Sequence, residues 1–559
     1  MSTHDRAREP KSCRPCAQAK VKCEPQSVDG CKRCLRLKRE CIMQAPGAHK
    51  RKVPKPSDVA RLEQKLDSMA AIFTESSKRL CGANIGGGSG HPIQVQSPPR
   101  SVPPCDEDIM LSDEEALLRL ETFRTEMTPY FPFVNVPTEF TVSELRQKKP
   151  FLLRAIVMVT CLEDANRQLA MAKNIRECIS TSIVVKGEQS LDLLQGLLVC
   201  LAWFHLQLQL GTHIYRLIHL ALGMLIELGL DRRSAPAGKM GPMINHLVRR
   251  GNPHTHRTLE ERRVYLGLFY INSITAMCRR DMDPMKYTDY TEECCRVLED
   301  AGEHPTDLYL VRLVRLHRMA GRIRRMLTID EYDSPGLILS APIGMCIKSI
   351  EAELRQLKQS LGLNSVPDPI LLLHYYAVEL SLYEIALEDD FPAKRYGDYP
   401  LTRLNILYSC LTVTKAFFDT FFLVPTRQYF NLPHSVHLAF SHALGILSKL
   451  LVFTGENWDQ EYVRSIIDFP VVTNTLVSRI QKAVEVSHLE QPPYRVPEMF
   501  VRLIPRVHVF EEIHEARRAA LMERGGDIAS DDISLTAAGD FIPDMIFPLP
   551  DDLLAIFTF

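Results

Sequence analysis

The residues with the clearest chemistry are six cysteines near the N-terminus, arranged in one spacing that occurs twice. The pattern is C-x2-C-x6-C, and seven residues separate the two copies. A structural zinc site takes four thiolates in a tetrahedron and leaves no position open for catalysis. Two separate sites need eight ligands, so six thiolates serve two zinc ions only if each half shares one sulfur. The sequence therefore predicts a binuclear zinc cluster that stabilises a segment too small to build a core. The six ligands are Cys13, Cys16, Cys23, Cys31, Cys34 and Cys41.

Disulfides and a single zinc ion are the alternatives for these cysteines. Residues 1–9 are polar and charged, unlike a signal peptide, and the other ten cysteines are scattered through apolar segments. Both features favour a reducing compartment, in which disulfides are rare. A module with one zinc ion stays open as an alternative, because C-x2-C pairs also occur in zinc ribbons and fingers. The repeated x6-C spacing favours the cluster with two ions.

The segment around the cysteines is strongly basic. Through Pro56 it holds fifteen Lys and Arg against five Asp and Glu, whereas the rest of the chain holds 52 and 63. The net charge of −1 therefore averages a basic N-terminal segment and an acidic body. Clustered positive charge is the electrostatic footprint of phosphate binding, so this end is predicted to bind nucleic acid.

Residues 12–23 (SCRPCAQAKVKC) and 30–41 (GCKRCLRLKREC) resemble the fungal binuclear zinc-cluster transcription factors. The resemblance implies a DNA-binding domain at residues 11–43 with two Zn²⁺ per chain. Cys13 and Cys31 would bridge both ions. Each half would be a short helix that follows its C-x2-C turn.

The same resemblance implies how the domain contacts double-stranded DNA. The first helix points into the major groove, and Lys20 donates to guanine O6 and N7 in a CGG-type triplet. Lys22 contacts phosphate. Ala17 and Ala19 stand where many family members are basic, and Gln18 between them contacts a base or a phosphate. The other candidates for DNA contact are the basic residues Arg14, Lys11, Arg36, Lys38 and Arg39.

Two short segments follow the zinc module. Residues 44–56 form a basic linker that is typical of a nuclear-import signal, with a solvated linker as the alternative. Residues 57–74 carry apolar residues at alternating spacings of three and four, which predicts a short coiled-coil dimerisation helix. An ordinary amphipathic helix is the alternative. The import candidates are Lys50, Arg51, Lys52 and Lys55, and the dimerisation candidates are Val59, Leu62, Leu66, Met69 and Phe73.

Residues 75–108 are rich in Gly and Pro and are predicted to be a disordered linker. Residues 109–520 instead show apolar residues at helical period, which predicts an all-helical domain. No stretch has eighteen uninterrupted apolar residues, so no membrane span is predicted. The clearest helical patterns cover residues 191–209, 215–230, 259–277, 369–388, 403–422 and 435–453.

This region also resembles the large helical middle domain of the same regulators. The resemblance implies a regulatory domain, which in some members is thought to sense a small molecule; the effector here is unknown. The segments that carry it are residues 123–134, 193–205, 220–230, 257–270 and 279–295.

The helical region lacks residues at the spacing of a catalytic motif, so the chain is predicted not to be an enzyme. The nearby histidines His205, His213 and His219 are interpreted as packed or hydrogen-bonded rather than as metal ligands. Cys294 and Cys295 lack the spacing of a redox motif. Trp203 and Phe204 are assigned to the core, and residues 260–263 (EERR) to a charged helix face or a set of internal ion pairs.

The C-terminal residues 525–559 contain no Lys or Arg and alternate acidic with bulky apolar residues. This composition is typical of an activation segment that folds on a coactivator or on the general transcription machinery. The alternative is a tail that packs on the helical domain.

Together these features predict a mainly α protein that acts in the nucleus as a zinc-dependent regulator of RNA polymerase II transcription. We expect a homodimeric activator, with a secondary-metabolite gene cluster as one class of target. The alternatives are a repressor or effector-gated regulator, and an enzyme that uses the cluster only for targeting.

Overall fold

The computed structural model describes residues 13–18, 22–27, 30–42, 112–211, 213–233, 257–279, 282–327, 343–363, 368–388, 400–455, 457–487, 489 and 496–527. The chain divides into two compact units, Met1–Arg100 and Ser101–Phe559. We call the first the cysteine unit and the second the helical unit. The import candidates, the predicted dimerisation helix, the linker at 75–108 and the tail from 528 onward lie outside the described residues.

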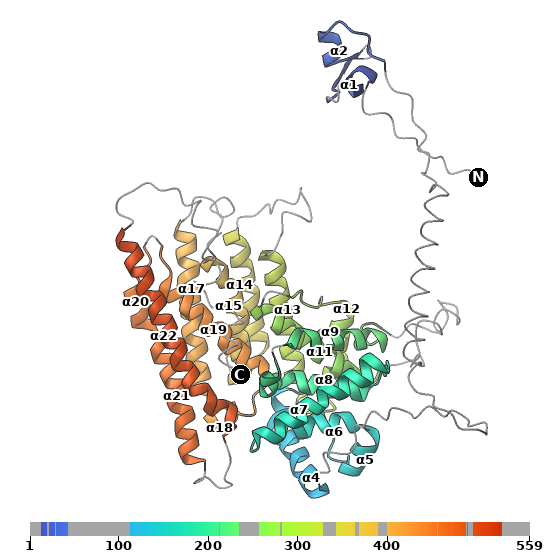
Figure 1. The fold of residues 1–559 in the computed structure, drawn as a ribbon, viewed down its shortest axis with the longest axis vertical. Coiled ribbons are helices and arrows are strands. Elements are labelled where there is room, and N and C mark those ends of the chain that lie inside the picture. The colour runs from blue at the N-terminus through green and yellow to red at the C-terminus, as the bar shows by residue number, and fades with distance from the viewer. Residues whose placement is uncertain are drawn as a thin grey trace, which may run out of the picture. The chain divides into compact units, whose positions relative to one another are not determined.

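The cysteine unit is built from two short helices and one short β-ribbon (Figure 1). Helix α1 (Arg14–Gln18) is followed by strand β1 (Pro25–Ser27), strand β2 (Gly30–Cys31) and helix α2 (Lys32–Arg36). The two strands pair antiparallel, with Pro25 opposite Cys31 and Ser27 opposite Gly30. The family resemblance implied the two helices but not the ribbon.

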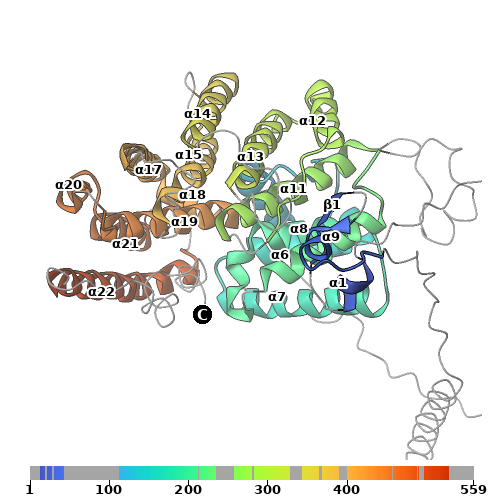
Figure 2. The same cartoon turned by 90° about the horizontal axis from the view of Figure 1, so that it is seen from above.

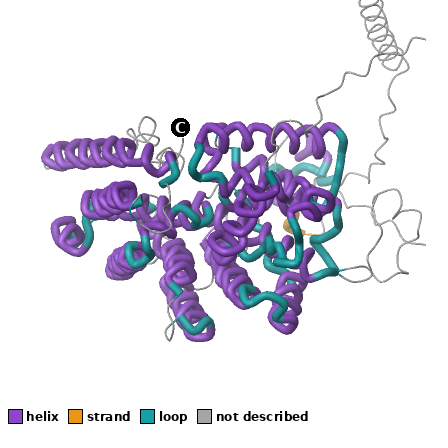
Figure 3. The backbone as a smooth tube through the Cα atoms, turned by 90° about the horizontal axis from the view of Figure 1, so that it is seen from below, coloured by secondary structure: helices purple, strands orange, loops and turns teal. Residues whose placement is uncertain are grey.

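The helical unit is almost entirely α-helical in its described residues (Figure 3), which confirms the predicted fold class there. Short polar side chains begin several helices; the Ser112 hydroxyl, for example, accepts the Glu115 amide at 3.2 Å. The first group of elements comprises α4 (Asp113–Thr122), η1 (Phe123–Met127), η2 (Thr128–Tyr130), α5 (Val142–Lys148), α6 (Pro150–Thr160), α7 (Ala165–Ile179), η3 (Ser180–Val185), α8 (Leu191–Ala202), η4 (Phe204–Leu210) and α9 (Ile214–Glu227).

The second group packs beside the first within the same unit (Figure 2). It comprises α11 (Leu259–Arg279), α12 (Asp289–Ala301), α13 (Asp307–Leu327), α14 (Ile343–Ser360), α15 (Pro369–Tyr383), η5 (Glu384–Leu387), α17 (Pro400–Phe421), α18 (Thr426–Tyr429), α19 (His434–Val452), α20 (Gln460–Ile466), α21 (Phe469–Val486) and α22 (Glu498–Asp527).

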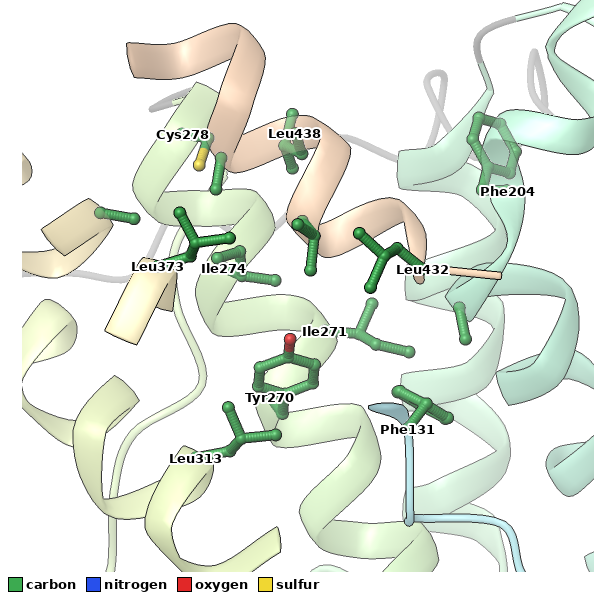
Figure 4. Close-up of a cluster of buried hydrophobic side chains, with 14 of the residues drawn as sticks. Phe131, Phe204, Tyr270, Ile271, Ile274, Cys278, Leu313, Leu373, Leu432 and Leu438 are labelled. Atoms are coloured by element: carbon green, nitrogen blue, oxygen red, sulfur yellow. The ribbon is translucent and has the colours of Figure 1, made fainter. Parts of the chain in front are cut away.

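Helix α11 lies at the centre of the helical unit. It packs against α8, α9, α12, α13, α15 and α19, and every residue from Arg263 to Arg279 is buried. Figure 4 shows Tyr270 of α11 among Ile271, Ile274, Leu313 and Leu373. A helix that is buried on all sides joins the two groups of elements into one continuous core.

The predicted helices agree with the structure to within a few residues, with one correction. The pattern over residues 191–209 predicted one helix, but the chain bends by 85° between α8 and η4. Trp203 lies at the bend, and its indole N–H donates to the Asn431 carbonyl at 3.1 Å. Trp203 and Phe204 are fully buried, as predicted.

Among the residues that the structure describes, two helical segments are long and apolar enough to cross a membrane by length and composition alone. They are Pro369–Leu387, which joins α15 and η5, and His434–Val452, which is α19; the bent α8–η4 pair would count as a third. In the folded unit, 83% and 89% of their apolar windows are buried against other helices. Their apolar composition is therefore explained by the core of this unit.

Candidate metal centre

The two cysteine repeats fold into two matching halves. In each half the first cysteine precedes a five-residue helix, and the second lies within that helix. The third cysteine returns to the first: the Cys13 amide donates to Cys23 Sγ at 3.4 Å, and the Cys31 amide donates to Cys41 Sγ at 3.3 Å. The sequence repeat is therefore also a structural repeat.

The distances between the sulfurs are those of metal ligands rather than of disulfides. Cys13 Sγ lies 3.8 Å from Cys31 Sγ and 3.7 Å from Cys34 Sγ, and Cys16 Sγ lies 3.6 Å from Cys31 Sγ. A disulfide would bring two sulfurs to about 2.0 Å. Four sulfurs placed tetrahedrally at about 2.3 Å from a zinc ion lie about 3.8 Å apart. The thiols therefore have the spacing that a tetrahedral site needs.

The six thiols form two sets of four that share two members. Within each set the sulfurs all lie within 4.8 Å of one another, and Cys13 and Cys31 belong to both sets. Cys16 and Cys23 complete one set, and Cys34 and Cys41 complete the other. A closed set of four thiolates is a donor set that zinc prefers in structural sites, so these residues can hold metal.

The two shared thiols also have the most favourable local electrostatics. Cys31 Sγ accepts the Cys34 backbone N–H at 3.4 Å, and the Cys16 backbone N–H acts on Cys13 in the same way. These backbone hydrogen bonds stabilise the thiolate and lower the pKa of Cys13, and they lower that of Cys31 to about 6. The thiolate is the form that binds metal. The sequence spacing gave no sign of this effect, which comes from the helix N-termini.

The β-ribbon joins the two halves. Besides the β1–β2 pairing, the Lys32 amide donates to the Glu24 carbonyl at 2.9 Å. Gly30 leaves room for Cys41, because a Cβ atom at position 30 would lie 3.1 Å from the Cys41 Cβ. The ribbon and this glycine fix the second half against the first.

The described candidates for DNA contact are exposed around the two helices. Lys22 has 85% of its side chain exposed and pairs with Glu24 at 3.2 Å. Gln18 ends α1 and is exposed. Exposed amide and cationic groups of this kind can reach phosphate or base edges. Arg36, Lys38 and Arg39 are also exposed.

The structure describes the remaining predicted DNA-contact residues only in part. Arg14 begins α1. Lys20, the predicted base-reading residue, and Lys11 lie outside the described residues. Both stay predictions that depend on the resemblance.

Within the described residues of the helical unit, no other group of His, Cys, Asp or Glu has metal-site spacing. The three nearby histidines do not converge, because His205 is buried whereas His213 and His219 are exposed. His205 instead packs against His434 and His437 of α19, with ring centroids 6.0 and 4.6 Å away. Burial lowers the pKa of all three of these buried imidazoles, which keeps them neutral.

The EERR segment at residues 260–263 forms ion pairs with other elements. Arg263 is buried and donates to both carboxylate oxygens of Asp307 at 2.8 Å. Glu260 pairs with Lys149. Cys294 and Cys295 are buried in the core and are not paired with each other. The two ion pairs join α11 to other elements, and the two cysteines are part of the core.

Comparison with known proteins finds one family model and several fungal transcription factors that match this chain. The family model for the WAR1 C-terminal domain matches residues 105–421. The transcription factor opdL of Penicillium oxalicum is 29% identical over 483 residues, which cover 84% of this chain and 83% of that protein. The transcription factor himD of Aspergillus japonicus is 27% identical over 492 residues, covering 85% and 79%.

A more distant relative is the transcriptional regulator WAR1 of Candida albicans. It is 22% identical over 440 residues, which cover 76% of this chain and 44% of that protein. No solved structure matches the chain.

Proposed function

Because the chain belongs to the family of fungal transcription factors that carry the WAR1 C-terminal domain, we propose that it is a zinc-dependent transcription regulator that binds CGG-type triplets. The observation that carries the proposal is the pair of four-thiol sets that share Cys13 and Cys31. The relatives are named as transcription factors, a class of proteins without enzymatic activity. The protein therefore acts by binding DNA and other proteins.

Two zinc ions per chain are proposed to fold the cysteine unit. The buried cluster in its described residues consists of Cys13, Cys16, Cys31 and Cys34 alone. A unit with so few buried side chains gains too little from apolar burial to fold unaided. Metal binding and folding are then one equilibrium.

DNA binding is proposed to use the first helix and the basic residues around both helices. Lys20 is the base-reading residue, and Lys22 with Arg36, Lys38 and Arg39 contacts phosphates. The exposure of the described members of this set supports the phosphate role. Such contacts attract the protein to any DNA, whereas Lys20 provides the sequence preference.

The protein is further proposed to act in the nucleus as a homodimeric activator. Residues 57–74 would join two chains, so that two cysteine units meet two half-sites. Residues 525–559 would recruit a coactivator. A reporter fusion of residues 525–559 tests whether this segment recruits a coactivator. Transcription above background supports an activator. Transcription at background favours the repressor or effector-gated alternative.

The direct test is an unbiased selection of DNA sequences by the zinc-loaded full chain. We expect paired CGG-like triplets at a fixed spacing. A single triplet would keep the DNA-binding role but remove the dimer. Recovery of sequences without a common motif would overturn the proposal.

A further inference from the structure

Helix α22 lies at the edge of the helical unit and packs against α21 and α19 (Figure 2). The face that it turns toward the unit is apolar, and its buried residues are spaced by three and four along the helix. This spacing is the pattern of a helix that buries one stripe of its surface. The buried residues are Phe500, Leu503, Val507 and Phe510.

A second apolar row runs along the opposite face of α22. Val501, Val509 and Ile513 are 40%, 54% and 40% exposed, and Pro505 between them is also exposed. We call these four residues the outer ridge. Residues spaced by four form one of the ridges with which helices pack against each other. Exposed apolar residues usually occur singly, whereas the outer ridge continues for about 18 Å, which is typical of a surface that contacts another molecule.

The charged residues beside the outer ridge differ between its two ends. Arg502 lies at the N-terminal end and Glu512 at the C-terminal end, and both are exposed. Within the described residues Glu512 forms no ion pair. Arg502 pairs with Glu498 in the same helix, and both side chains are almost half exposed, so this pair contributes little to stability. A guanidinium has five N–H groups, so Arg502 can contact a second carboxylate as well.

The outer ridge is complementary to a copy of itself in antiparallel orientation. Two identical helices that share one interface are related by a two-fold axis, so each contact occurs twice. With this axis at the level of Val507, Val501 faces Ile513 of the second copy. Pro505 faces Val509 of the second copy in the same register. Apolar residues therefore meet apolar residues along the whole ridge.

The same register pairs the charges of the two helices. Arg502 faces Glu512 of the second copy, and the symmetry repeats this pair at the other end of the contact. A parallel arrangement would instead bring each of these residues next to its own copy, which places like charges together. Electrostatic complementarity of this kind fixes register and orientation, so the charges favour the antiparallel arrangement.

We propose that the outer face of α22 binds a second copy of this chain in antiparallel orientation. The outer ridge excludes water between the two helices, and the two Arg502–Glu512 pairs set the direction. A contact about 18 Å long on a helix about 10 Å wide is far smaller than the roughly 800 Å² per partner of a stable interface, so the self-association is weak. It is separate from the predicted dimerisation helix at residues 57–74 and does not depend on the proposed DNA binding.

The test measures self-association of the zinc-loaded full chain by sedimentation equilibrium over a range of concentrations. The chain carries Leu62→Asp and Leu66→Asp, which place charges in the predicted coiled-coil seam, so that contacts elsewhere are measured. We expect a reversible dimer. Val509→Asp should raise its dissociation constant by about tenfold or more, because a charge then lies within the apolar contact. Val471→Asp, at a residue of α21 that is 63% exposed, is the control and should leave the dissociation constant unchanged.

Exchange of the two charges tests the register. Arg502→Glu and Glu512→Arg should each weaken self-association by about tenfold, because both symmetric pairs become repulsive. A mixture of these two variants should recover the affinity of the parent, because every pair between unlike chains then joins opposite charges.

Three results would overturn the proposal. The first is a parent chain that stays monomeric at every concentration. The second is an unchanged dissociation constant in Val509→Asp. The third is a mixture of the two charge variants that associates no more tightly than either variant alone.

Discussion

The two units of the chain differ in the residues that they bury. The helical unit buries more than a hundred apolar residues in one continuous cluster. Among its described residues the cysteine unit buries four cysteines, while Leu35, Leu37 and Ile42 stay 44–48% exposed. We therefore expect the cysteine unit to depend on its metal ligands and the helical unit on packing, so that each responds to a different perturbation.

Cys31→Ser should produce the largest difference between the responses of the two units. Because Cys31 belongs to both thiol sets, the variant should lose both zinc ions and all specific DNA binding. The thermal unfolding of the helical unit should not change. Tryptophan fluorescence can report on that unit alone, since the chain has two tryptophans, Trp203 and Trp458, and both lie there.

Cys346→Ser is the control for this variant, because Cys346 is a partly exposed cysteine of the helical unit. It should keep zinc and DNA binding. A Cys31→Ser protein that keeps two zinc ions would contradict the shared role of Cys31.

Acid should next affect the helical unit through its buried histidines. Burial lowers the pKa of His374 and His434 to about 3 and that of His437 to about 4. The unfolded chain binds these protons near pH 6.5, so stability is present above that pH and falls as the pH drops toward the folded values. At pH 5 each histidine should cost about 2 kcal/mol. Urea unfolding followed by tryptophan fluorescence at pH 7, 6 and 5 measures the loss.

Protonation of Glu379 should change the stability of the helical unit in the opposite direction over the same pH range. Burial raises its pKa to about 7, so lowering the pH toward 5 relieves a cost of folding. Glu379→Gln should therefore make the loss of stability in acid steeper. A stability that does not change between pH 7 and 5 in both proteins would contradict the neutral burial of the histidines.

Truncation of the core should destabilise the helical unit and leave the zinc content unchanged. Phe269→Ala on the central helix α11 should cost about 3–5 kcal/mol, because Phe269 is only 1% exposed. Leu423→Ala, at a side chain that is 75% exposed, should change stability by less than about 0.5 kcal/mol. Equal effects of the two variants would contradict the assigned core.

Lys20→Ala tests the cysteine unit without disturbing its metal. It should weaken binding to the selected site by about 1–3 kcal/mol and relax the preference at one base pair. Lys22→Ala should instead weaken binding to all sequences and reduce its dependence on salt. Unchanged sequence preference in Lys20→Ala would remove the base-reading role.

Adding one methyl group at either of two helical glycines tests the packing of the helical unit. A Cβ atom at Gly267 would lie 2.7 Å from the Phe133 Cβ, so Gly267→Ala should cost about 1–3 kcal/mol. Gly321 has nothing within 4 Å of such an atom, and Gly321→Ala should stabilise the helix by about 0.5–1 kcal/mol. Chemical denaturation of both variants shows whether their effects have opposite signs.

The sequence predicted the features that are local or periodic. The spacing of the cysteines required two shared sulfurs, and the structure brings Cys13 and Cys31 into both sets. Helical periodicity located elements such as α11 and α19 to within two residues. Each of these signals is contained in a short stretch of chain, which is why sequence analysis could find it.

The features that were missed depend on contacts between distant residues. The bend at Trp203 is supported by a bond to Asn431, which is 228 residues away. The Arg263–Asp307 ion pair joins helix α11 to helix α13 across 44 residues of sequence. The sequence does not show which distant residue will form an ion pair with a charged residue on a helix.

The most direct test of the account is the zinc content of the full chain, measured by native mass spectrometry. We expect two zinc ions bound by six cysteines, because Cys13 and Cys31 each belong to both thiol sets. A chain that binds one zinc ion, or none, would contradict the shared cluster and the function that depends on it.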